Sequence, residues 1–284
     1  MASVTPPHGR GIPGVPDPAV AARDEVRLSR RALKPPGDVH EARKHLKRAR
    51  AFLRLCEAGA EGAPAATLRR EIRDAGRELA ALRDREAVLE ALHDLDGESR
   101  IPASVLAVLR AQAARDPEGD RETLAQVRRG LRKTGRRMAV LAGAASAEDW
   151  LRTLGASYRR ARRAYRRARS RPTGESLHAL RKRAKDLRYQ VEWLAPVWPG
   201  VLGAWAEELH LLTDALGRTQ DVRVVRRQLE GAAAQGDRRR VALILWDLRR
   251  DGRRARRDAL ARGAKLFTEG AGSFTRRMAA LAES

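Results

Sequence analysis

The same four residues occur twice in this chain at one helical spacing. The first set is His40, Arg43, Lys47 and Arg50, and the second is His178, Arg181, Lys185 and Arg188. Each residue of an α-helix advances by about 100°, so side chains at offsets of 0, 3, 7 and 10 fall within roughly 80° of one another. Each set, called a quartet below, therefore predicts one stripe of cationic or protonatable side chains along a helix.

Apolar residues occupy the sector next to each quartet. They are Val39, Ala42, Leu46, Ala49 and Leu53 in the first segment, and Leu177, Leu180, Ala184, Leu187 and Val191 in the second. The basic stripe should therefore border a buried face, where a guanidinium or ammonium group is costly without a counter-charge. Neither quartet carries a carboxylate, so two such helices face to face would line a cleft for a polyanion. The alternative is two ordinary solvated faces, but the recurrence of all four identities disfavours it.

The similarity between the two halves extends beyond the quartets. Leu79, Asp84, Val88 and Leu92 match Leu216, Asp221, Val225 and Leu229 at a constant offset of 137, whereas the quartets match at 138. Helical periodicity dominates from residue 18 onward, without sustained alternating β-branched segments. We therefore predict an all-α protein in which two pseudo-symmetric four-helix repeats form one helical bundle with a basic central groove.

Pro and Gly clusters divide the chain into expected helices and segments. The first repeat should cover about 18–142 and the second about 147–268, between a disordered Pro/Gly-rich leader at 1–17 and a short tail at 269–284. The expected helices are 18–33, 38–57, 66–95, 103–141 with a break near Pro117 and Gly119, 147–171, 175–195, 201–231 and 236–268, with a short helix near 274–282.

The composition restricts the partners and the compartment. The chain has 59 Lys and Arg residues against 36 Asp and Glu residues, a formal charge of +23, so an acidic partner is expected. Cys56 is the single cysteine, which excludes an internal disulfide. The apolar stretches are too short to span a bilayer and the leader has no apolar signal region, so we expect a cytoplasmic protein without membrane association.

Four segments resemble the CHAD family, the conserved histidine α-helical domain, over roughly residues 18–268. They are VHEARKHLKRARAFL, LHALRKRAKDLRYQVEWL, LAALRDREAVL and LTDALGRTQDVRVV. The resemblance implies a basic groove, between two four-helix repeats, that binds inorganic polyphosphate. It implies binding roles for both quartets, Arg73 and His210, where His210 stands in place of an expected Lys. Gly217 fits a Leu-Gly pair of the family, whereas Ala80 replaces that glycine in the first half.

Several of these residues also have a structural interpretation. Asp84 and Asp221 lie at equivalent positions of a cation-rich bundle, so we expect them to hold Arg or Lys side chains or to cap a helix, and not to contact a polyanion. The quartet histidines could instead be packed imidazoles bonded to a neighbouring helix. Tyr189 could donate its hydroxyl group to the ligand or simply pack in the core.

No sequence motif points to an enzyme. HExxH, GxxxxGK[ST], GxGxxG, GxSxG and paired CxxC are all missing, and we expect neither a metal nor a cofactor. One alternative is a protein that binds DNA or RNA non-specifically through its charge. Aromatic residues make up only 4% of the chain, which disfavours base stacking. Another alternative is a basic scaffold that contacts acidic proteins or polyphosphate granules through Trp150, Trp198, Trp205 and Trp246.

Overall fold

The described part of the chain is built from helices. The computed structural model describes residues 11–35, 37–59, 61–96, 117–232 and 238–283, and these residues contain no strand. The all-α prediction is therefore confirmed. The α-helices are α1 (Pro18–Ala32), α2 (Val39–Leu55), α3 (Gly62–Asp96), α5 (Pro117–Arg137), α6 (Ala147–Ser170), α7 (Gly174–Leu194), α8 (Pro199–Ala232), α9 (Arg238–Leu266) and α10 (Ala271–Glu283).

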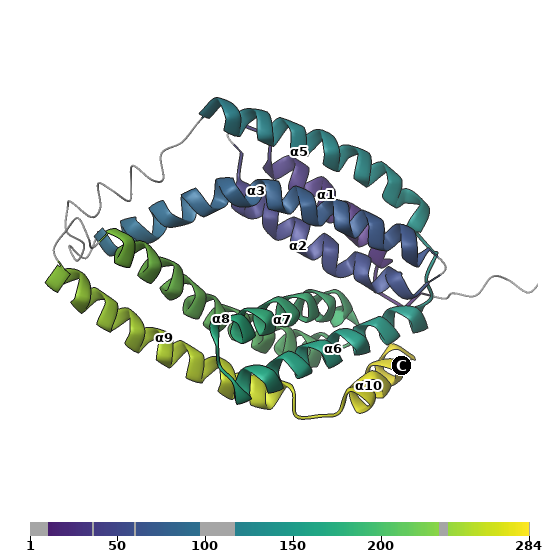
Figure 1. The fold of residues 1–284 in the computed structure, drawn as a ribbon. Helices are drawn as coiled ribbons and strands as arrows, with labels where there is room; N and C mark the ends of the chain where they lie inside the picture. Colours follow the sequence, from purple (N-terminus) through teal and green to yellow (C-terminus); the bar gives the residue numbers. More distant parts are fainter. Residues whose placement is uncertain (1–10, 36, 60, 97–116, 233–237, 284) are drawn as a thin grey trace, which may run out of the picture.

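The helices gather in two groups that follow the chain order. Figure 1 shows α1, α2, α3 and α5 on one side of the molecule and α6 to α9 on the other, with α10 beside α6. The two quartet helices meet between the groups, where α2 packs against α7. The buried side chain of Gln190 on α7 donates a hydrogen bond to the backbone carbonyl of Ala51 on α2, at 2.9 Å. This contact joins the two groups of helices.

Both quartet helices begin at a polar cap. The side chain of Asp38 accepts a hydrogen bond from the Glu41 backbone N–H at 2.8 Å, and the Thr173 hydroxyl accepts one from the Ser176 N–H at 3.2 Å. Such caps satisfy backbone donors that have no partner within the first turn. They therefore fix where each quartet helix starts.

Several helices begin earlier than the sequence predicted, most clearly α3, α8 and α10. Helix α3 begins at Gly62, so it includes Pro64, and α8 begins at Pro199. A proline is tolerated in the first turn because the missing N–H would have no intrahelical acceptor there. Residues 62–65 of the expected break are thus part of the helix. Residues 97–116 lie outside the described residues, and they include residues 103–116 of the helix expected at 103–141.

The predicted disordered leader at 1–17 needs correction for its second half. Ile12 and Val15 are buried in the core, and the Trp193 indole donates a hydrogen bond to the Pro16 carbonyl at 2.8 Å. Asp17 caps α1 through the Ala19 N–H, at 2.7 Å. Two apolar side chains and this cap hold residues 11–17 against the bundle, and residues 1–10 lie outside the described residues.

The core confirms the apolar faces predicted beside the quartets. All ten of those residues are buried, from Val39 to Leu53 on α2 and from Leu177 to Val191 on α7. Cys56 is buried as well, and burial raises the pKa of its thiol to about 12. Of the tryptophans considered as scaffold contacts, Trp150 is buried, Trp205 packs partly buried against the core, and Trp198 and Trp246 are exposed.

Candidate anion-binding groove

A groove of about 740 Å³ lies among α2, α3, α7 and one residue of α8. The buried side chains of Leu46 and Ile72 form part of its lining. Two carboxylates, of Glu175 and Asp186, also line it. The cationic side chains on the lining are Arg43, Lys47, Arg50, Arg54, Arg73, Arg77, Arg181, Lys182, Arg183 and Lys185. Positive charge therefore exceeds negative charge strongly in this groove.

The two quartets contribute to the same groove. Three members of the first quartet, Arg43, Lys47 and Arg50, line it from α2. Three members of the second line it from α7, and they are His178, Arg181 and Lys185. Arg73 lines it from α3, with its Nε donating to the neighbouring Asp74 carboxylate at 3.0 Å. Seven of the ten residues predicted to bind the ligand are thus brought together.

Lys47 is a partly desolvated cation of the groove and lies among like charges. Burial, and then the charges of Lys185, Arg43 and Arg181, lower the pKa of Lys47 from 10.5 to about 7. No described carboxylate lies within ion-pair distance of its ammonium group. A lysine that is desolvated among like charges titrates near neutral pH, so an anion bound here would restore its positive charge.

Arg50 and Arg54 extend the cationic lining toward the end of α2. Burial lowers the pKa of both guanidinium groups, while the nearby Asp186 carboxylate opposes this shift. Arg54 Nη2 lies 3.7 Å from Asp186 Oδ2. The Nε atoms of both arginines are buried without a hydrogen-bond partner among the described residues. The groove residues therefore carry N–H donors that make no hydrogen bond within the described part of the protein.

Arg181 rests directly on the backbone of α8. Its Nε donates to the Thr213 carbonyl at 3.3 Å, and a Cβ added at Gly217 would lie 3.0 Å from its Nη2. The missing side chain at Gly217 therefore leaves room for the guanidinium group. In the first half, Ala80 on α3 lines the groove at the position that matches Gly217.

His178 both contacts a neighbouring helix and lines the groove. Its Nδ1 lies 2.6 Å from Gln220 Oε1 on α8, while the imidazole also lines the groove. A carboxamide oxygen can only accept, so Nδ1 carries the proton. The neutral ring then presents an acceptor at Nε2, and only the imidazolium form can donate to a bound oxyanion there.

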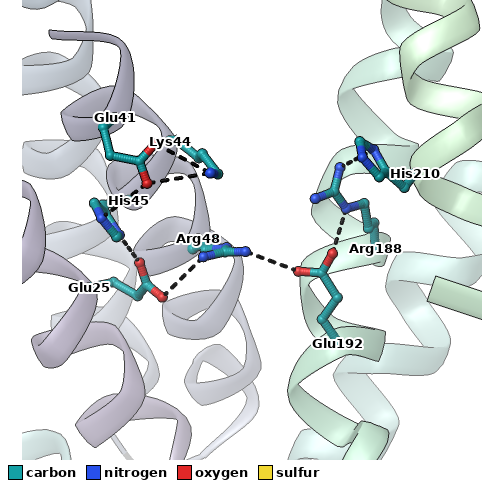
Figure 2. Close-up of polar contacts among 8 residues, drawn as sticks. All are labelled: Glu25, Glu41, Lys44, His45, Arg48, Arg188, Glu192 and His210. Atoms are coloured by element: carbon teal, nitrogen blue, oxygen red, sulfur yellow. Dashed lines mark hydrogen bonds and ion pairs between the residues drawn. The ribbon is translucent and has the colours of Figure 1, made fainter. Parts of the chain in front are cut away.

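Three residues predicted to bind lie outside the lining. Arg188 is buried, and its Nε donates to Glu192 at 2.5 Å while its Nη1 donates to His210 Nδ1 at 2.8 Å (Figure 2). Both Arg188 and His210 are therefore engaged with each other and away from the groove. His40, in the first turn of α2, is exposed and does not line it. This corrects the expectation that complete quartets share the groove.

The contacts of Arg188 belong to a chain of polar residues that crosses between the halves. Figure 2 shows Arg48 of α2 between Glu25 of α1, at 4.0 Å, and Glu192 of α7, at 3.7 Å. The Glu25 carboxylate also forms a hydrogen bond with His45 Nδ1, at 2.6 Å. Arg48 and Arg188 both lie over the ring of Tyr189, at 5.6 and 5.2 Å from its centroid. Tyr189 is buried, and it also lines the groove.

The sequence missed four cations of the lining, Arg54, Arg77, Lys182 and Arg183. Arg54 is fourteen residues after His40, which places it inside the same 80° stripe, so helical arithmetic could have found it. Arg77 follows Arg73 by one turn. The expected structural roles of Asp84 and Asp221 stay predictions, because both side chains lie outside the described residues.

The described residues contain neither a candidate metal site nor a candidate membrane-spanning helix. No group of three or more His, Cys, Asp or Glu side chains is placed to hold a metal ion. In the same part of the chain, no helix has the length and apolar character needed to cross a membrane.

Comparisons with known proteins identify the family. A sequence model of the CHAD domain matches residues 20–230. A crystal structure of the CHAD domain from the plant Ricinus communis is similar in fold, with a TM-score of 0.60 and 22% sequence identity over 98% of this chain and 95% of that chain. No curated protein matches the sequence. Since the matched residues cover well over half of the sequence, the chain belongs to the CHAD domain family.

Proposed function

We propose that this protein binds inorganic polyphosphate in the groove between α2, α3 and α7, and that it does so without catalysis. The observation that carries the proposal is the convergence of Arg43, Lys47, Arg181 and Lys185 from two distant segments on one lining. Like charges held together in a partly buried site destabilise the free protein. A polyanion in the groove would relieve that repulsion.

The chemistry of the lining favours a chain of phosphates over other anions. Guanidinium groups offer forked donors to oxyanions, and ammonium groups act as compact point charges. From Arg43 to Arg54 the cations follow α2 for eleven residues, about 16 Å of helix. An elongated ligand with negative charge along its whole length matches this arrangement better than a single small anion does.

Nucleic acid is the weaker ligand for this groove. Recognition of single strands depends on aromatic faces on which bases stack. The aromatic side chain on the lining is Tyr189, which is buried and covered by Arg48 and Arg188. The exposed arginines of α6 and α9 could still attract DNA non-specifically at low salt.

A binding role also fits the groups that line the groove better than catalysis does. His178 is oriented by the amide of Gln220 and not by a carboxylate, so the pair lacks the acid–base relay typical of hydrolytic sites. In the cell, the protein is proposed to be cytoplasmic. Its binding of polyphosphate would attach it to polyphosphate granules or serve in phosphate regulation.

Competition at increasing salt tests the proposal against general cationic attraction. Binding of long-chain polyphosphate and of a DNA duplex should be measured side by side as the salt concentration rises. Polyphosphate binding should persist at salt concentrations that abolish DNA binding, because the groove cations are partly desolvated and screened less. Equal salt sensitivity of the two ligands would contradict the proposal.

A further inference from the structure

A second cluster of arginines lies outside the groove, between α1 and α5. These helices border a cleft of about 650 Å³, called the outer cleft below. In Figure 1, α1 and α5 lie at the far side of the first group of helices, with α2 and α3 between them and α7. The lining residues are Arg23, Asp24, Arg27, Arg30, Arg132, Gly135, Arg136 and Ala139.

The charges of the outer cleft are unbalanced. Asp24 is the one carboxylate on the lining, and it pairs with Arg27 at 3.2 Å. Arg30 on α1 has no described carboxylate within ion-pair distance. Burial, followed by the charges of Arg132, Arg128 and Arg136 on α5, lowers the pKa of Arg30. The two helices thus hold arginines against one another across the cleft, an arrangement that an anion between them would stabilise.

One donor of Arg30 is left unused. Its Nε is buried and has no hydrogen-bond partner among the described residues. A buried donor without a partner costs free energy that a ligand can recover. The neighbouring Gly135 and Ala139 lack long side chains, so the space beside the guanidinium groups stays open.

The spacing of the arginines describes the shape of the ligand. Arg23, Arg27 and Arg30 follow one face of α1 at offsets of four and three, and Arg132 and Arg136 are one turn apart on α5. The α1 row covers about 10 Å along the helix axis. Two facing rows of forked donors suit several consecutive oxyanions, and no aromatic side chain on the lining offers a stacking surface for a base.

We propose that the outer cleft is a second polyphosphate-binding site and that one protein molecule can hold two polyphosphate segments at once. The choice of ligand rests on the proposed function, whereas the existence of the site rests on the α1 and α5 arginines. Because α2 and α3 separate the two sites, a short chain occupies one of them at a time. Long chains can then be linked to each other through the protein, which multiplies the strength of attachment.

Titration calorimetry with a short polyphosphate of defined length tests this proposal by stoichiometry. The wild-type protein should bind two equivalents. The variant Arg30→Gln/Arg132→Gln/Arg136→Gln should bind one, while the groove variant Arg43→Ala/Arg181→Ala should keep the equivalent bound in the outer cleft. As the charge-matched control, Arg253→Gln/Arg254→Gln/Arg257→Gln on α9 should still bind two.

The outcomes separate the two proposals. Loss of one equivalent in the outer-cleft variant, but not in the α9 control, supports the second site whatever the groove variant does. Two equivalents in the outer-cleft variant would overturn it. If the outer-cleft variant loses DNA binding but keeps both polyphosphate equivalents, the outer cleft is a nucleic-acid surface and the proposal is overturned. Circular dichroism should show unchanged helicity, and the single change Arg132→Gln should weaken one of the two binding steps at least several-fold if the triple variant does not fold.

Discussion

Lys47 on α2 and Lys185 on α7 repel each other across the two halves of the protein. After burial, the charge of Lys185 is the largest influence that lowers the pKa of Lys47 to about 7. The two lysines occupy the same quartet position, since the second follows the first by the 138-residue offset. The repeated sequence thus brings two copies of one cation into one groove, which makes the free groove unfavourable and an anionic ligand favourable.

Polyphosphate affinity should fall as the pH rises above about 7. Below this pH, Lys47 is charged in both the free and the bound protein. Above it, the free side chain is neutral, and binding must protonate it because the phosphates raise its pKa. The affinity should decrease by up to about tenfold per pH unit, with proton uptake visible by calorimetry in buffers of different ionisation enthalpy.

The variant Lys47→Arg is the control for this effect, because a guanidinium group stays charged throughout the range. It should lose the proton uptake and flatten the affinity profile above neutral pH. The same pH dependence in this variant would assign the proton to another group.

Replacement of Lys47 by methionine should stabilise the folded protein at neutral pH. Since the folded-state pKa lies below the unfolded value, the unfolded chain binds more protons between about pH 7 and 10.5, and wild-type stability rises with pH across that window. Lys47→Met removes the cost of the buried charge, on the order of a few kcal/mol at or below pH 7. Urea unfolding should show the gain shrink as pH rises, and a constant gain would contradict the assignment. The variant should bind polyphosphate more weakly.

Gly217→Ala should separate stability from binding. An added Cβ would lie 3.0 Å from Arg181 Nη2, so the end of that flexible side chain must move. Alanine favours the helix by up to about 1 kcal/mol over glycine, so unfolding experiments should show equal or higher stability while polyphosphate affinity falls several-fold. Gly203→Ala on the same helix is the matched control, because nothing lies within 4 Å of its added Cβ. Unchanged affinity in Gly217→Ala would contradict the placement of Arg181.

Two ion pairs join α2 and α7 in a reciprocal arrangement. Arg48 lies 3.7 Å from Glu192, and Arg54 lies 3.7 Å from Asp186. The 138-residue offset takes Arg48 to Asp186 and Arg54 to Glu192, so each pair is the counterpart of the other with its charges exchanged. The first half supplies the cations and the second half supplies the carboxylates.

Replacing Glu192 should cost more folding stability than replacing Arg48, its partner in the ion pair. Glu192 also accepts from the buried Arg188 at 2.5 Å, so Glu192→Gln weakens the compensation of a buried charge and should cost about 1–3 kcal/mol. Arg48 is more exposed and its contacts are long, so Arg48→Gln should cost less than about 1 kcal/mol. Urea denaturation measures the free energy of unfolding of both variants. Equal losses of stability would contradict the different roles assigned to Glu192 and Arg48.

The sequence was sufficient for the features that depend on local periodicity. The apolar faces beside the quartets were predicted from spacing alone, and Leu46 and Leu180 are buried as expected. The same arithmetic placed Arg43 and Arg181 beside that buried face, where both line one groove. These features follow because helical geometry decides them within a few turns.

The departures from prediction depend on partners that a repeat pattern does not show. Arg50 and Arg188 are equivalent in sequence, but the residue one turn later is Arg54 in the first case and Glu192 in the second. Glu192 draws the Arg188 guanidinium away from the groove, and His210 receives its other end. Similarly, the burial of Ile12 depends on tertiary packing that a Pro/Gly-rich composition hides.

The affinity of the groove variant Arg43→Ala/Arg181→Ala for long-chain polyphosphate tests the central claim most directly. It should be compared with Arg253→Ala/Arg254→Ala on α9, which removes the same charge from exposed positions. We predict that the groove variant keeps its helicity and loses affinity by at least about a hundredfold, as expected for two charge-assisted contacts worth 1.5–3 kcal/mol each, while the α9 variant changes little. Equal losses in the two variants would contradict a groove-specific site.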